Sequence, residues 1–257
     1  MNQSPELLAA LEAAGEAASI ARSMYQQHLE VRIKTDQSPV TDADLRCESA
    51  IRAILEARFP DYGFFGEETP SRNIDAENLW LVDPIDGTKA FTRQYPMFST
   101  QIALLRRGEL VLGVSSAPVY GELAFAERGS GAYLNGSALA VSEIAELESA
   151  ALSAGNLRSL AASDQWSRYG KLVARVDRIR GYGDFLHYHL LAAGKIDAVI
   201  ESDVHILDIA ACAAIVTEAG GRCTDLSGAP LTLRSQSMLA TNGHLHAQVL
   251  AELAWSA

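Results

Sequence analysis

The chain has 257 residues, of which 48% are hydrophobic and 21% charged, an ordinary balance for a globular protein that argues against long disordered segments. Its formal net charge of -11 makes the phosphate backbone of a nucleic acid an unfavourable partner. The sequence has no apolar run near the roughly 20 residues of a membrane-spanning helix, so we expect no membrane partner either.

Residues 1–29 predict a helix rather than a targeting segment. They lack the basic start and compact apolar centre of a signal peptide, and their apolar residues recur at helical spacing. The three cysteines, Cys47, Cys212 and Cys223, show no CxxC spacing, and we expect packed thiols rather than disulfide partners or zinc ligands. The expectation that follows is a cytoplasmic protein.

The first half of the chain predicts helices followed by an antiparallel sheet. A second helix is expected over residues 42–58, ending before Pro60. Residues 79–82 are a short apolar run that predicts a buried strand. Alternating apolar residues and intervening turn residues then predict a meander with strands at 98–105, 110–117 and 123–126.

From residue 150 onward, short strands alternate with helices. Strands are predicted at 151–154, 178–180, 198–201, 222–225 and 238–240, and helices at 164–175, 184–193, 208–218 and 244–253. The predicted fold class is therefore α/β, with an α+β first half over residues 1–147 and an α/β second half over residues 148–257.

Two carboxylates, Asp83 and Asp86, follow the predicted strand 79–82 in the segment LWLVDPIDGTKAF. Ligands in mixed α/β folds lie at such strand ends, and two acids on one rigid turn repel each other unless a cation lies between them. An all-oxygen site favours Mg²⁺ or Mn²⁺ over zinc. Gly87 allows close backbone approach, and a helix that begins near Thr88 would offer N–H groups to a phosphate. Taken alone, however, the segment favours an ordinary turn.

Three other polar segments change that interpretation. In GFFGEE, an apolar pair runs into the acids Glu67 and Glu68. In LDIAACAAIVTEAGG, Asp208 opens a helix, where an N-cap role explains it equally well. KTDQSPVTDAD, residues 34–44, is a polar loop that leads into a helix.

With these four motifs in this order, the sequence resembles the inositol monophosphatase superfamily of Mg²⁺-dependent, lithium-sensitive phosphatases over nearly the whole chain. The resemblance implies a layered αβαβα sandwich, in which residues 1–147 carry most metal ligands and residues 148–257 complete the substrate pocket. It also implies a small phosphorylated metabolite as substrate, two or three Mg²⁺ ions (with Mn²⁺ as a substitute) and a homodimer.

The resemblance also implies roles for individual residues. Thr88 matches the threonine that orients the attacking water, and Asp44 matches the acid that hydrogen-bonds this threonine. Together with Glu67 they are the expected catalytic residues, while Gly87 and Thr88 are expected to hold phosphate. The implied reaction is hydrolysis of a phosphomonoester by metal-activated water, without a covalent enzyme intermediate. The implied metal ligands are Glu67, Asp83, the main chain of Ile85, Asp86 and Asp208.

One position departs from the family pattern. Leu207 stands where the family commonly has a tryptophan directly before the late metal-binding aspartate. A leucine leaves the metal ligand intact but supplies neither a flat wall nor an indole N–H donor on the substrate side.

Two further acids are expected to contact the substrate. Glu201 lies seven residues before Asp208, where the family often places an acid that contacts the leaving group. In GYGDFLHYHLLAAG, Asp184 and Tyr188 match the histidinol-phosphatase branch of the superfamily. An extra acid suits a cationic substrate, although Asp184 is explained equally well as the N-cap of its helix. His205 is a further substrate-binding candidate.

Other functions remain open at this point. The remaining histidine pairs, His187 with His189 and His244 with His246, are assigned to structure or surface rather than to zinc. A histidinol-phosphatase-like enzyme is the leading hypothesis. Its alternatives are an inositol-1-monophosphatase, then a 3′(2′),5′-bisphosphate nucleotidase or a fructose-1,6-bisphosphatase. A regulatory binding protein that retains the fold is the non-enzyme alternative, against which the complete set of acids argues.

Overall fold

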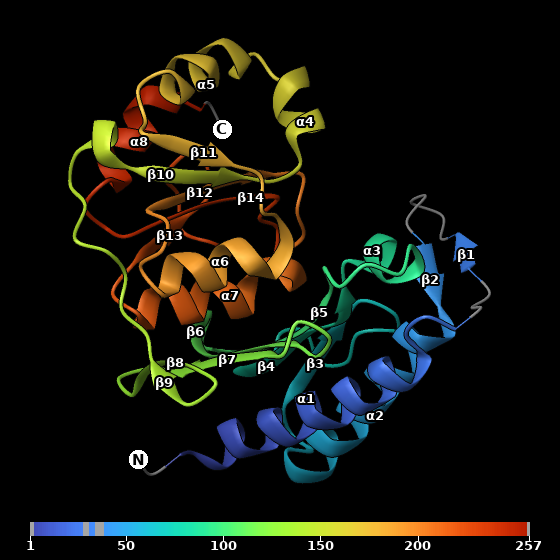
Figure 1. Cartoon of the computed structure of the whole chain (residues 1–257). Helices are drawn as coiled ribbons and strands as arrows, with labels where there is room; N and C mark the ends of the chain where they lie inside the picture. The colour runs from blue at the N-terminus through green and yellow to red at the C-terminus, as the bar shows by residue number, and fades with distance from the viewer. Residues whose placement is uncertain (1–2, 28–30, 34–38, 256–257) are drawn as a thin grey trace.

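The computed structural model describes residues 3–27, 31–33 and 39–255 of the chain. Residues 34–38, at the start of the KTDQSPVTDAD motif, lie outside the described residues. Helices and sheets alternate in five layers (Figure 1). Helices α1 and α2 form one outer layer, α6 and α7 lie between the two sheets, and α4, α5 and α8 cover the far side (Figure 1). The predicted αβαβα sandwich is confirmed.

The helices have the following bounds: α1 Pro5–Met24, α2 Asp42–Arg58, α3 Thr88–Thr92, α4 Leu157–Ala162, α5 Trp166–Val173, α6 Asp184–Ala192, α7 Ile206–Glu218 and α8 His246–Leu253, with a 3₁₀ turn η1 at Leu147–Ser149. The helix predicted at 164–175 is the shorter α5, and α4, which precedes it, was not predicted. None of the described helices combines the length and apolar character needed to cross a bilayer.

The strands have the following bounds: β1 Val31–Ile33, β2 Pro39–Thr41, β3 Gly63–Gly66, β4 Asn78–Asp86, β5 Ser99–Arg106, β6 Glu109–Ala117, β7 Glu122–Glu127, β8 Gly131–Leu134, β9 Ser137–Ala138, β10 Ala151–Ala154, β11 Arg178–Arg180, β12 Ala198–Ser202, β13 Arg222–Thr224 and β14 Ser237–Thr241. The first sheet has the order β3-β4-β5-β6-β7-β8-β9, and the second has the order β11-β10-β12-β14-β13. In the first sheet β3 runs parallel to β4, whereas the following strands form the predicted antiparallel meander.

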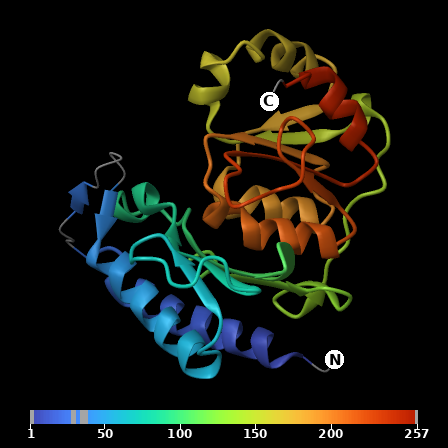
Figure 2. The same ribbon diagram turned by 180° about the vertical axis from the view of Figure 1, so that it is seen from behind.

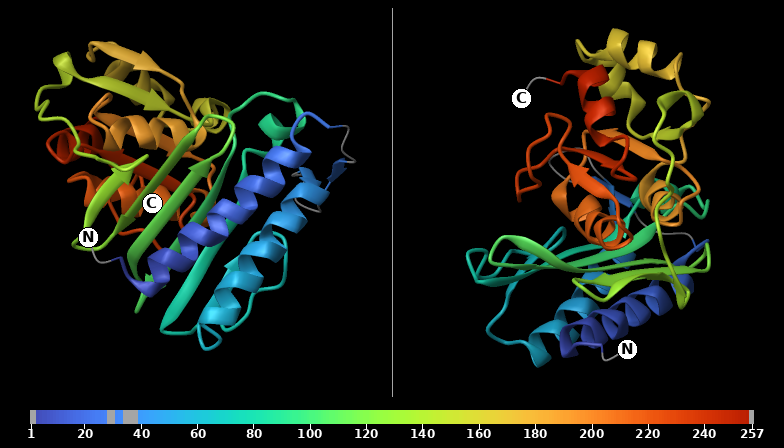
Figure 3. Two further views of the ribbon diagram at one scale, coloured as in Figure 1. Left: turned by 60° about the horizontal axis from the view of Figure 1, so that its bottom comes forward. Right: turned by 90° about the vertical axis from the view of Figure 1, so that its left-hand side faces the viewer.

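An alanine-rich face lets α1 pack closely against α2. The Ser4 hydroxyl caps α1 by accepting the Leu7 N–H at 3.0 Å, and Pro5 occupies the first turn, where its missing N–H costs nothing. The buried face carries small side chains, and the Cys47 thiol of α2 donates to the Ala17 carbonyl at 3.5 Å. The two helices lie side by side across one face of the first sheet (Figure 3, left).

The predicted strand 79–82 is too short. Pairing in β4 continues past Val82, so that Asp83 faces Gln101 and Asp86 faces Ser99. Three steps along β4 therefore match two steps along β5, which is a β-bulge, and Pro84 sits inside it because a bulge tolerates a residue without an N–H. The proline did not end the strand, and the acids belong to the sheet rather than to a loop after it.

Helix α7 lies between the two sheets, and a glycine makes its close approach possible. A Cβ added to Gly113 of β6 would lie 2.3 Å from the Ala211 carbonyl oxygen of α7. Residues 139–146 connect the first sheet to the second, at the right-hand side of the molecule in Figure 2, near the predicted division at residue 147.

Gly113→Ala is expected to destabilise the protein by about 1–3 kcal/mol, because the methyl group would push α7 away from the sheet. The measurement is urea unfolding followed by circular dichroism. Gly15→Ala is the matched control, since an added Cβ there meets nothing within 4 Å and α1 should gain about 0.5–1 kcal/mol. Equal effects of the two substitutions would contradict the close packing of α7.

Candidate active site

Six carboxylates line one cavity of about 410 Å³ where β4, α3 and the start of α7 meet. Of the predicted site residues, Ile85, Gly87 and Thr88 line this cavity too, whereas His205 and Glu201 are not among its lining residues. The sequence patterns did not point to Asp203, which is also present. The acids are Glu67, Asp83, Asp86, Asp184, Asp203 and Asp208.

The bulge of β4 holds Asp83 and Asp86 in fixed positions. Asp83 Oδ1 accepts the Ile85 N–H at 3.0 Å, and the Thr100 hydroxyl donates to the Pro84 carbonyl at 2.8 Å. Asp83, Asp86 and Asp208 each bring an oxygen within 4.8 Å of the others. Three carboxylates are therefore held close together by the fold itself.

The electrostatics of this cluster call for a cation. Burial, followed by the charges of Glu67, Asp86 and Asp208, raises the pKa of Asp83 well above its ordinary value. The pKa of Asp86 is raised in the same way, by burial and by neighbouring carboxylates. Burial is also the main reason that the pKa of Asp208 rises to about 7. Carboxylate oxygens are the ligands that Mg²⁺ prefers, so these residues fit a divalent metal ion.

Asp208 is not the N-cap of its helix, as one interpretation of the sequence had it. The N-cap of α7 is His205, whose Nδ1 accepts the Leu207 N–H at 3.3 Å. Asp208 occupies the third helical position and accepts the His205 N–H at 2.8 Å, which completes a capping box. The His205 ring packs edge-on against Phe65 at 5.6 Å, so the contacts of its side chain are those of a cap. Leu207 is buried in the core between the sheets and forms no wall of the cavity.

The structure brings Thr88 and Asp44 together across 44 residues of sequence. The Thr88 hydroxyl lies 3.1 Å from Asp44 Oδ1 and 3.2 Å from the Ile85 carbonyl oxygen. The other oxygen of Asp44 accepts the Thr41 N–H at 2.8 Å and the Thr41 hydroxyl at 2.6 Å, which fixes the start of α2. Burial raises the pKa of Asp44. Gly87 has φ of +92°, a conformation that favours glycine, and begins α3.

Glu48 fixes the backbone of the GEE motif through hydrogen bonds. This carboxylate is fully buried on the inner face of α2 and accepts the Glu68 N–H at 2.7 Å and the Thr69 N–H at 2.8 Å. A Cβ on Gly66 would lie 2.6 Å from the Glu48 carboxyl group, so this close approach requires glycine. The signal for Glu48 was an acid one turn after Asp44 on the apolar face of a helix.

Glu201 and Asp184 approach the acidic cavity from the second half of the chain. Asp184 is the first residue of α6, with φ of +47° and without a side-chain cap bond, so the N-cap interpretation is wrong and Gly183 is the N-cap. Burial and the charge of Glu201 raise the pKa of Asp184 to about 6. Glu201 in β12 is 6% exposed and accepts hydrogen bonds from Tyr188 and His187.

Comparison with known proteins agrees with this geometry. The family model described as the inositol monophosphatase family matches residues 2–257. The chain belongs to the inositol monophosphatase family. The predicted resemblance is thereby confirmed over the whole chain.

The relatives of this family member include named phosphatases of full length. A histidinol-phosphatase from Mycobacterium tuberculosis is 41% identical and covers 96% of this chain and 97% of its own. A histidinol-phosphatase from Chlorobaculum parvum is 35% identical, with coverage of 97% and 96%. The solved structure of extragenic suppressor protein suhB from Bartonella henselae has a TM-score of 0.88 at 31% identity and covers 99% of this chain and 100% of that one. The family member described here is a phosphomonoester hydrolase.

A buried network behind the clustered acids of this family member was not predicted. The Gln101 amide donates to the Ser99 hydroxyl at 2.8 Å and to the Ser115 hydroxyl at 3.1 Å. Ser99 donates onward to an aspartate of the cluster, and Ser115 lies 2.9 Å from His189 Nε2. The bonds connect Asp86, Ser99, Gln101, Ser115, His189 and Glu122. Ser99 and Gln101 are two residues apart and so share one face of β5. Their hydrogen-bond partners, however, can be known only from the register of the neighbouring strands.

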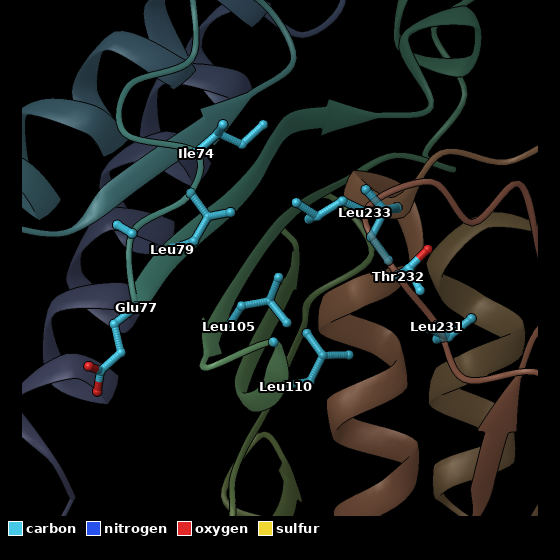
Figure 4. Close-up of a pocket in the computed structure, with 11 residues that line it drawn as sticks. Ile74, Glu77, Leu79, Leu105, Leu110, Leu231, Thr232 and Leu233 are labelled. Atoms are coloured by element: carbon cyan, nitrogen blue, oxygen red, sulfur yellow. The ribbon is translucent and has the colours of Figure 1, made fainter.

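A second cavity, of about 300 Å³, lies between the first sheet and the loop 231–233 (Figure 4). Its lining is mainly apolar and contains none of the six acids of the acidic cavity. The labelled leucines converge from the sheet and from that loop (Figure 4). The carboxylates that fit a divalent metal ion therefore lie in the acidic cavity and not in this one. The apolar lining consists largely of Ile74, Leu79, Leu105, Leu110, Ile206, Leu231 and Leu233.

Proposed function

We propose that this phosphatase hydrolyses the phosphate ester of a cationic amino alcohol, and that its substrate is histidinol phosphate. The observation that carries the proposal is the pair of acids Asp184 and Glu201 beside the metal-binding cluster. Burial, followed by the charge of Glu201, raises the pKa of Asp184 to about 6, so the two carboxylates are close enough to repel each other. A positively charged leaving group would relieve this repulsion, whereas a neutral inositol would not. Two relatives named histidinol-phosphatase support the same substrate.

We assign the metal to the residues that fit it. Glu67, Asp83, Asp86, Asp208 and the Ile85 carbonyl would hold two or three Mg²⁺ ions, with Mn²⁺ as a substitute. When bound, these ions supply the activation of water and the stabilisation of negative charge at the phosphate. A homodimer and a cytoplasmic location stay predictions.

The side chains of this protein would orient the reactants. Because Asp44 accepts the Thr88 hydroxyl hydrogen, the lone pairs of Thr88 face outward and can accept a hydrogen from the attacking water. The N–H groups of Gly87 and Thr88 would donate to phosphate oxygens as charge develops there. Asp184 and Glu201 would bind the ammonium or imidazolium of the leaving group and so place it opposite the water.

The test is a Mg²⁺-dependent phosphate-release panel. It compares histidinol phosphate, inositol 1-phosphate, adenosine 3′,5′-bisphosphate and fructose 1,6-bisphosphate. We expect kcat/KM to be highest for histidinol phosphate, and Asp184→Asn to lower that value by about 10- to 100-fold while changing the value for inositol 1-phosphate less than about threefold. A preference for inositol 1-phosphate would overturn the substrate and favour the inositol monophosphatase alternative. Release from none of the four would favour a regulatory binding protein.

A further inference from the structure

One carboxylate oxygen of Glu201 is hydrogen-bonded within the protein, and the other is not. Its Oε2 accepts the Tyr188 hydroxyl and lies 3.1 Å from His187 Nε2. Its Oε1 has no hydrogen-bond partner among the residues that the structure describes, and a Cβ on Gly155 would lie 2.1 Å from it. Glycine at 155 therefore leaves room for this carboxylate. One acceptor oxygen is available to a ligand.

His187 is held in a single tautomer. A bare Nε2 would place its lone pair against those of the Glu201 carboxylate, so the ring hydrogen belongs on Nε2. Nδ1 then accepts from the Ser153 hydroxyl, 3.3 Å away. The Ser153 oxygen accepts the Tyr182 N–H at 3.1 Å, and its own O–H remains to donate to Nδ1. Donation therefore runs in one direction, from Tyr182 N–H through Ser153 and His187 to Glu201.

This series of hydrogen bonds ends at Glu201 and begins two residues before Asp184. Ser153 lies on β10, His187 on α6 and Glu201 on β12, and all three are buried. Tyr182 belongs to the loop that leads into Asp184, whose φ of +47° depends on how that loop is held. A change at His187 would therefore act on the leaving-group end of the cavity and leave the metal-binding end in place.

We propose that His187 is a positioning residue for substrate selection, which is held by Ser153 and donates through Nε2 so that Glu201 is turned toward a cationic leaving group. The inference rests on the proposed function, because it is the cationic group that Glu201 binds. His187 touches no reacting atom. Its action is on the orientation of Glu201, through a donated hydrogen bond.

The experiment compares His187→Phe, which keeps a ring but removes both nitrogens, with His187→Gln, whose amide can still donate to Glu201. Each is assayed with histidinol phosphate and with p-nitrophenyl phosphate, whose leaving group carries no positive charge. We expect His187→Phe to lower the ratio of the two kcat/KM values by about 10- to 50-fold, mainly through KM for histidinol phosphate. His187→Gln should keep the ratio within about threefold of wild type.

Two further variants separate positioning from folding. Ser153→Ala should lower the ratio more in the His187 background than in the His187→Gln background, since the loss of the Tyr182 contact is common to both but an amide has no tautomer to select. This comparison is the test if His187→Phe does not fold. His246→Phe is the control, because His246 is equally buried but bonds Thr224 and Thr241 instead. It should lower stability and leave the substrate ratio unchanged.

Inhibition by the products gives a reading that does not depend on turnover of the ester. Histidinol should inhibit His187→Phe more weakly than wild type, while inhibition by inorganic phosphate should be equal. Equal losses with both substrates, or a Gln variant no better than Phe, would overturn the role of His187 alone. A wild type without preference for histidinol phosphate would overturn the proposed function and this inference with it.

Discussion

Asp83→Asn is expected to lower kcat/KM by about 10³-fold or more and, at the same time, to raise the melting temperature of the metal-free protein. Asp83 is only 2% exposed, and the charges nearest to it belong to Glu67, Asp86 and Asp208. Asparagine keeps the shape of the aspartate side chain, and its oxygen can still accept the Ile85 N–H. It removes a negative charge that the metal needs but that destabilises the metal-free fold. Loss of activity should therefore accompany a gain in stability.

The measurement pairs phosphate release at saturating Mg²⁺ with thermal unfolding in a chelator. Asp61→Asn is the control, because Asp61 is exposed and lies outside the acidic cavity. Neither quantity should change in that variant. If Asp83→Asn kept activity within about tenfold of wild type, the assignment of Asp83 as a metal ligand would be wrong.

Without metal, the protein is expected to lose stability as the pH rises above about 6.5, and Mg²⁺ should restore more stability at pH 8 than at pH 6.5. The carboxylates of the cluster have folded-state pKa values above their unfolded values, with that of Asp208 at about 7 and those of Asp83 and Asp86 well raised. The folded state then holds more protons than the unfolded state, so the free energy of unfolding falls as those protons leave. Over this window the loss is on the order of 1–3 kcal/mol.

The lower limit of the window is set by His246. Burial lowers the pKa of this histidine to about 4, so its contribution has the opposite sign and is lost as the pH falls below the unfolded value of 6.5. Above that pH, the acids alone determine the slope among these groups. Urea unfolding at several pH values, in chelator and in excess Mg²⁺, measures it. Stability that rises with pH in chelator would contradict the repulsive cluster.

The clustering of the acids that we assign to the metal was predictable because its signals are local. Asp83 and Asp86 stand in one short segment, and Glu67 and Asp208 each accompany a recognisable turn or helix start. The bulge in β4 was not predictable, because a proline after an apolar run also ends many strands. Only the register with β5 shows that pairing resumes at Asp86.

The supporting residues were not predictable for a different reason. His187 and Glu201 are 14 residues apart, and Ser115 and His189 are 74 apart, so each pair depends on how a helix is rotated above a sheet. Sequence spacing does place His187 and His189 on opposed sides of α6, but it cannot say what each side meets. Glu48 had a visible signal, an acid on an apolar helix face, whose partner was hidden in a loop.

Helix α6 contacts both ends of the proposed active site, through His187 and His189. Residues two apart on a helix point about 200° from each other, and here one faces Glu201 while the other faces the network that ends at Asp86. A shift of this helix would therefore disturb both the recognition of the leaving group and the binding of the metal. Evolution toward a new leaving group should therefore conserve the packing of α6 and vary the residues around its first turn. A family could in this way change its substrates while its hydrolytic chemistry stayed constant.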